Sequence, residues 1–187
     1  MVHPWRGQLG LMVLSLLLSS CAYKFSAQDR ILPGDVERVA VPIFKNNTHE
    51  AGVEVPFTNA LVRELERSRV VRVVPENMAQ ARLEGEITDI VYESTGFRTR
   101  GLPAGSSLSI GYRVYLTVQL RLRDQKTGKS LWSGQFLGER SYRAPGLTLE
   151  GLNSSNALYN QSARQQTIEE LAKDLMLQAH TQLTENF

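Results

Sequence analysis

The stretch YRVYLTVQLRLR, Tyr112 to Arg123, alternates apolar and polar side chains over its whole length. Successive side chains of a β-strand point to opposite faces of a sheet, so this pattern predicts one dry face and one wet face. The dry face comprises Tyr112, Val114, Leu116, Val118, Leu120 and Leu122, and the wet face comprises Arg113, Tyr115, Thr117, Gln119, Arg121 and Arg123. The segment therefore predicts a half-buried strand in a sheet.

The residues after this strand predict an antiparallel hairpin. A turn, DQKTGK at 124–129, leads to a second strand over Ser130–Tyr142. TGKS at 127–130 matches the end of a phosphate-binding P-loop, but the first glycine of that motif would fall at Arg123. The segment is therefore interpreted as a turn.

Three earlier segments also have the composition of strands. The apolar run over Val36–Phe44 predicts a strand that is buried on both faces. A short strand is expected over Val70–Val74, where Pro75 ends it, and another over Arg82–Ser94. Five strands are thus expected in all.

Two segments have helical periodicity. Val53, Phe57, Leu61 and Leu65 recur every four residues, which is typical of an amphipathic helix. The last segment predicts a second helix, which Ser154 or Ser155 can cap. Its apolar stripe consists of Leu158, Ile168, Leu171, Ala172, Leu175, Ala179 and Leu183.

The expected order of elements is β-α-β-β-β-β-α, and 42% of the residues are hydrophobic, enough for a core. The simplest arrangement is a single α+β domain, with two helices packed on one face of a roughly four- to five-stranded mixed sheet. The other face of that sheet is left for a partner.

The amino-terminal residues predict a targeting signal. Arg6 precedes Leu9–Leu18, an apolar run that is too short to cross a roughly 30 Å hydrocarbon core and suits a secretory signal. Leu18-Ser19-Ser20-Cys21 resembles the bacterial lipobox, in which the cysteine becomes lipid-modified and amino-terminal. The alternative, an ordinary signal peptide, would leave a reactive free thiol. Residues 1–20 are thus expected to be a signal peptide and residues 21–35 a lipidated tether.

No catalytic constellation can be assembled from the sequence, so the protein is expected not to be an enzyme and to need no cofactor or metal. The mature chain has no second cysteine and no GxSxG motif. Its histidines, His49 and His180, lack neighbours at ligand spacing and are interpreted as solvated. The formal net charge of +2 gives no bulk attraction to polyanions, so any basic site must be local.

The most basic part of the chain runs from Arg98 to Arg143. Ser94–Gly111 is expected to be a long loop, with Phe97 beside Arg98 and Arg100. Arginine suits phosphate groups because its planar guanidinium donates in pairs. The alternative is that the basic residues are solvated charges of the sheet. For Arg98 and Arg100 we favour a phosphate-bearing ligand, and nucleic acid is not expected outside the cytoplasm.

Several segments, in this order, resemble the LptE family of lipopolysaccharide-assembly lipoproteins. They are CAYKF at 21–25, VERVAVPIFKNNTHEAGVEVPFTNALVREL at 36–65 and ARLEGEITDI at 81–90. The resemblance implies that residues 36–187 form a helix-on-sheet domain. It implies a periplasm-facing protein of the outer membrane. Ala22 agrees with that location, because an Asp directly after the lipid-modified cysteine retains enterobacterial lipoproteins at the inner membrane. It also implies a plug inside the LptD β-barrel that helps to assemble the barrel and binds lipopolysaccharide.

The resemblance also implies particular contacts. Gly96-Phe97-Arg98 is similar to a ligand-binding position of the family. A second basic position falls near Gly134 or Gln135, which are uncharged, so Arg140 or Arg143 is the candidate to replace it. The lipopolysaccharide-binding candidates are Arg98, Arg100, Arg140 and Arg143, and the partner-facing candidates are Phe97, Tyr115, Thr117 and Gln119. The alternative function is that of another outer-membrane lipoprotein, which activates a cell-wall synthase or assembles a secretion channel.

Overall fold

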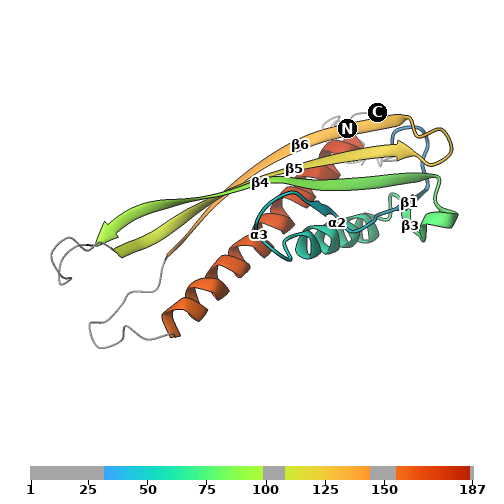
Figure 1. Cartoon of the computed structure of the whole chain (residues 1–187). Coiled ribbons are helices and arrows are strands. Elements are labelled where there is room, and N and C mark those ends of the chain that lie inside the picture. Colours follow the sequence, from blue (N-terminus) through green and yellow to red (C-terminus); the bar gives the residue numbers. More distant parts are fainter. Residues whose placement is uncertain (1–31, 99–107, 144–154, 186–187) are drawn as a thin grey trace, which may run out of the picture. The chain divides into compact units, whose positions relative to one another are not determined.

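A computed structural model describes residues 32–98, 108–143 and 155–185 (Figure 1). The elements are β1 (Arg38–Ala40), β2 (Lys45–Asn46), α2 (Glu54–Ser68), β3 (Arg72–Val73), a 3-10 turn (Glu76–Met78), β4 (Ala81–Arg98), β5 (Leu108–Asp124), β6 (Ser130–Arg143) and α3 (Ser155–Glu185). The expected α+β class and the helix-on-sheet arrangement are confirmed. The expected signal peptide, Cys21, most of the tether, Arg100 and Ser154 lie outside the described residues.

The strands form one mixed sheet in the order β3-β1-β4-β5-β6, with β2 pairing to β4. The pairs among β1, β2, β3 and β4 are parallel, whereas β4-β5 and β5-β6 are antiparallel. The sheet thus has six strands, one or two more than expected, because the apolar run over Val36–Phe44 does not form a single strand.

The prediction of one strand buried on both faces over Val36–Phe44 is therefore wrong. β1 ends at Ala40 and β2 begins at Lys45, and the side chain of Ile43 between them is 67% exposed. Pro42 has no N–H group to donate to a ladder. The Phe44 backbone N–H donates instead to Thr58 Oγ1 of α2, at 3.0 Å. The backbone therefore leaves the sheet at Pro42 and returns to it at Lys45.

The expected long loop over Ser94–Gly111 is also wrong at both ends. β4 continues to Arg98 and β5 starts at Leu108, with Gly96 opposite Gly111 and Arg98 opposite Leu108. Irregularities in the register lie on either side of Gly96. Glycine and serine are weak strand formers, so composition hid an extension that depends on backbone pairing to a long neighbour.

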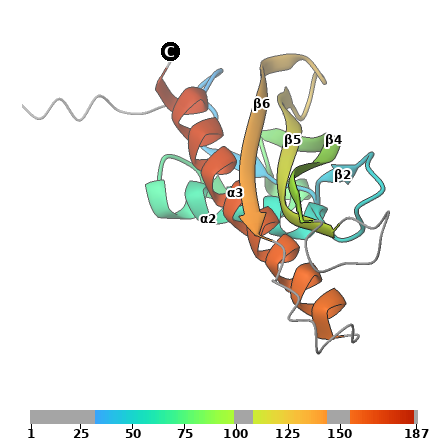
Figure 2. The ribbon, with the colours of Figure 1, turned by 90° about the vertical axis from the view of Figure 1, so that its left-hand side faces the viewer.

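The core lies between one face of the sheet and the two helices, as the ribbons in Figures 1 and 2 show. The alternation of β5 is confirmed, because Val114, Leu116, Val118, Leu120 and Leu122 are each at most 1% exposed. α3 runs alongside β6 and approaches it closely at Gly138. A methyl group on Gly138 would lie only 2.9 Å from Leu175 Cδ1. Neither α2 nor α3 contains an apolar stretch long enough to cross a membrane.

Candidate functional site

The face of the sheet opposite the helices carries an apolar stripe, which consists of Val91, Tyr115 and Leu137. Val91 on β4 lies opposite Tyr115 on β5, and Leu137 on β6 lies opposite Thr117, two residues along β5. The side chain of Leu137 is 71% exposed and that of Val91 is 41% exposed. In the described part of the chain no element covers this stripe. The structure thus brings Tyr115, Thr117 and Gln119 to one open face, as the alternation predicts.

Charged side chains occupy the same face nearer the β5–β6 turn. Glu84 lies 3.4 Å from Arg82 Nε and 3.3 Å from Arg123 Nε, and Glu86 lies 3.9 Å from Arg121 and 3.7 Å from Lys45. These ion pairs neutralise much of the basic character that the sequence shows for β5. They favour the interpretation of Arg121 and Arg123 as solvated charges of the sheet.

The opposite end of the sheet gathers basic positions. Arg98 is the last residue of β4, and Arg143 is the last residue of β6. Both strands end near Gly111 of β5, which lies opposite Arg143 on one side and opposite Gly96 on the other. From strand spacing and rise, the backbones of Arg98 and Arg143 are about 14 Å apart. The side chain of Arg143 is exposed. The topology thus brings these two candidates to one end of the sheet, while Phe97 is in β4 beside Arg98.

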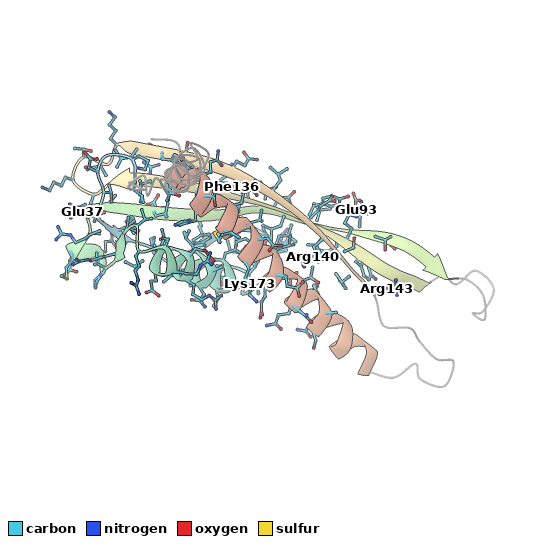
Figure 3. The ribbon with its side chains drawn as sticks, turned by 180° about the vertical axis from the view of Figure 1, so that it is seen from behind. Glu37, Glu93, Phe136, Arg140, Arg143 and Lys173 are labelled. Carbon is cyan, nitrogen blue, oxygen red and sulfur yellow. The ribbon has the colours of Figure 1, made fainter. Side chains whose placement is uncertain are left out.

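Arg140 has a different environment. Its guanidinium lies 2.5 Å from Glu170 and 2.5 Å from Asp174, one helical turn apart on α3. The hydrogen bond from Arg140 to Asp174 is the main cause that raises the pKa of Arg140. Figure 3 shows Arg140 where β6 passes α3, with Arg143 farther along the strand. A phosphate ligand would have to compete with two carboxylates for this side chain.

We predict that Arg140 stabilises the docking of α3. Arg140→Gln is expected to lower the free energy of unfolding by about 1 kcal/mol, because half-exposed ion pairs are weak and two act together here. Urea unfolding measures this change, and the variant Glu170→Gln with Asp174→Asn serves as the second arm of a double-mutant cycle. Unchanged stability together with weaker lipopolysaccharide binding would instead assign Arg140 to the ligand.

A cluster that the sequence did not predict joins the loop before α2, β4 and α3. The Tyr92 hydroxyl donates to Glu50 Oε2 at 3.1 Å, and Arg164 Nη2 lies 3.3 Å from Glu50 Oε1. The Arg164 guanidinium also lies 5.6 Å from the centre of the Tyr92 ring. Burial, with the nearby charge of Glu50, raises the pKa of Tyr92. No local pattern connects residues so far apart in the chain, so only the fold reveals this cluster.

The histidines do not form a metal site with other described residues. No group of three or more histidine, cysteine, aspartate or glutamate side chains in residues 32–98, 108–143 and 155–185 could hold a metal ion. His49 is exposed, as expected. The prediction that His180 is solvated is wrong, because its side chain is 4% exposed on the core-facing side of α3.

The fold and these surfaces define a helix-on-sheet α+β domain that offers binding surfaces. The family model described as "LptE: Lipopolysaccharide-assembly" matches residues 36–183. The chain belongs to the LptE family, a family of non-enzymatic outer-membrane lipoproteins of lipopolysaccharide assembly. This match confirms the resemblance that the sequence motifs indicate.

Solved structures with similar folds come from several bacteria. A Helicobacter pylori protein described as a neuraminyllactose-binding hemagglutinin homolog is 12% identical, with a TM-score of 0.50 over 83% of this chain and 90% of that chain. Lipoprotein B from Nitrosomonas europaea is 18% identical, with a TM-score of 0.49 over 87% and 90%. A minor lipoprotein from Acinetobacter baumannii is 12% identical, with a TM-score of 0.45 over 80% and 92%. A search of the curated proteins finds no sequence that matches this chain.

Proposed function

We propose that this protein is a lipid-anchored plug of an LptD-like outer-membrane β-barrel, which it helps to assemble and within which it binds lipopolysaccharide during delivery to the cell surface. Membership of the LptE family supports the general role. The anchor at Cys21 rests on the lipobox-like sequence before it.

The observation that carries the partner part of the proposal is the open face of the sheet. Leu137 lies diagonally across from Tyr115, and Val91 lies opposite Tyr115 on the other side, so the three side chains form an apolar row across the open face. Exposed apolar side chains that gather on one face favour an interaction surface. Leu137, 71% exposed, lies at the edge of the sheet on β6, and Tyr115 on β5 lies at the centre of the stripe. In this proposal the stripe contacts the inner wall of the barrel, and the helices face the lumen.

Co-expression with the candidate barrel tests the partner directly. The proposal predicts a stable one-to-one complex that survives purification in detergent. Repeated isolation of the lipoprotein without any outer-membrane barrel would contradict the plug role, whatever the outcome of ligand-binding experiments.

The ligand part rests on the basic end of the sheet. Arg98 ends β4 and Arg143 ends β6, the two strands on either side of β5, and Arg100 follows two residues after Arg98 in the chain. Arginine donates bidentate hydrogen bonds to phosphate, and lipid A carries phosphate groups. We therefore assign lipopolysaccharide contact to this end, with Arg143 in preference to Arg140 as the second basic contact.

We predict that Arg98→Asp with Arg100→Asp weakens lipopolysaccharide binding by roughly tenfold or more, because each change replaces an attractive charge by a repulsive one. Titration of purified lipopolysaccharide onto the lipidated protein measures the affinity. Arg67→Asp with Lys126→Asp, exposed basic residues elsewhere, is the charge-matched control. Equal affinities for both double variants would remove this site assignment and leave the plug role standing.

A further inference from the structure

A groove runs between α2 and α3 on the helical side of the domain. Its volume is about 550 Å³, within the range of roughly 300–1,000 Å³ typical of small-molecule sites. Asn59 and Arg63 of α2 line one wall. A row of α3 side chains spaced by four residues lines the other wall: Gln161, Gln165, Glu169 and Lys173. Residues four apart share one helix face, so each helix presents a continuous polar row to the groove.

The floor of this groove is apolar and fixed. Val53 is 2% exposed and Ile168 is 5% exposed, and Pro56 lies beside them. At one end Arg164 is held by Glu50, whose carboxylate also accepts the Tyr92 hydroxyl. The groove therefore has a buried apolar base between two polar rims.

The groove has an excess of available positive charge. Neither Arg63 nor Lys173 forms an ion pair with another described residue, and Lys173 lies on α3 beside α2 (Figure 3). The carboxylate of Glu50 is already satisfied by Arg164 and Tyr92. Among the described residues that line the groove, Glu169 is the one other carboxylate, and it opposes an anion. The charges on the rims thus favour a ligand with at least one negative group.

The three amide side chains narrow the class of ligand. Asn59, Gln161 and Gln165 can each donate and accept hydrogen bonds, which suits hydroxyl groups. A helical peptide would need a row of apolar pockets, and this groove offers only a narrow apolar floor. A sugar with a phosphate or carboxylate group satisfies both the amides and the cations.

We propose that the groove between α2 and α3 binds an anionic saccharide. The inference rests on the proposed function for the source of that sugar, because lipopolysaccharide presents phosphorylated sugars. It adds a second contact on the helical side of the domain, separate from the basic end of the sheet. Arg63 and Lys173 bind the anionic group, and the amides orient the ring.

Calorimetry on the full-length lipidated protein in detergent tests this site. The probe is lipopolysaccharide stripped of its acyl chains, as a phosphorylated oligosaccharide and in dephosphorylated form. Arg63→Glu with Lys173→Glu is expected to weaken binding of the phosphorylated probe at least about fivefold. Glu169→Gln is expected to tighten it about twofold, since it removes the opposing charge. Lys126→Glu with Lys129→Glu, two exposed basic residues between β5 and β6, is the charge-matched control and should bind as the unchanged protein does.

Further measurements distinguish binding in the groove from binding elsewhere on the protein. Shifts of the side-chain amide signals of Asn59 and Gln165 on titration would place the probe in the groove, and inorganic phosphate alone should produce much weaker shifts. Equal binding by the Arg63/Lys173 variant and the unchanged protein would overturn the inference. Equal affinity for the phosphorylated and dephosphorylated probes would overturn the assignment of phosphate as the anionic group. If intact lipopolysaccharide still binds and depends on Arg98 and Arg100, the proposed function survives that failure. If neither the probe nor intact lipopolysaccharide binds, both the inference about the groove and the proposed lipopolysaccharide-binding function are overturned.

Discussion

Replacing Cys21 by serine, in protein that is expressed without the barrel partner, is expected to move the protein from the membrane fraction to the soluble fraction. The proposed anchor adds about 0.8 kcal/mol of membrane affinity for each buried methylene group, and more than one acyl chain makes the attachment stable. Cell fractionation followed by immunoblotting measures the change, and the expected effect is close to complete.

Ser20→Ala is the matched control for this experiment. It keeps a small residue before Cys21, so lipid modification and membrane attachment should persist. Mass spectrometry of the amino-terminal peptide supplies an independent readout. An unmodified thiol at position 21 in the native protein, or a serine variant that stays in the outer membrane, would contradict the anchor.

The second large effect is expected at the apolar stripe on the sheet. Leu137→Lys with Tyr115→Lys should lower the yield of the barrel complex at least about tenfold, because it places charges in the centre of a desolvated contact. The fold should survive, since Leu137 is 71% exposed and Tyr115 lies opposite Glu139, a favourable neighbour for lysine.

Leu177→Lys controls for this pair of changes. Leu177 is 45% exposed on α3, so the substitution adds a charge in place of an exposed leucine on the helical side. We expect the Leu177→Lys variant to form the barrel complex in the same yield as the unchanged protein. An equal loss from Leu177→Lys would mean that the helices, rather than the sheet, meet the barrel.

The alternation of strands and the helical periodicity of apolar residues predicted the main elements. Burial of one face of an element produces both the sequence pattern and the packing. The alternation from Tyr112 to Arg123 gave β5 and its buried face, and the spacing from Val53 to Leu65 gave α2. The number of strands was predicted less well, because the expected single strand over Val36–Phe44 is divided into β1 and β2. Pro42 interrupts Val36–Phe44, but the way the chain returns to the sheet involves the hydrogen bond of Phe44 to Thr58, a contact with another segment.

The candidate site was predictable only in part for the same reason. The open face of β5 follows from its alternation, and the basic character of the segment around Arg98 is visible in the composition. The pairing of Arg140 with Glu170 and Asp174 depends on how α3 crosses β6, so the sequence alone could not separate Arg140 from Arg143. The groove between α2 and α3 and the Tyr92 cluster likewise arise from the packing of distant segments.

Photo-crosslinking in living cells shows whether the open face of the sheet contacts the barrel. A photoreactive amino acid is placed at Leu137 in one protein and at Leu177 in another, each co-expressed with the barrel in living cells. We expect a single adduct to the barrel from position 137, in much larger amount than any adduct from position 177. Crosslinks from position 177 alone, or none from either position, would contradict it.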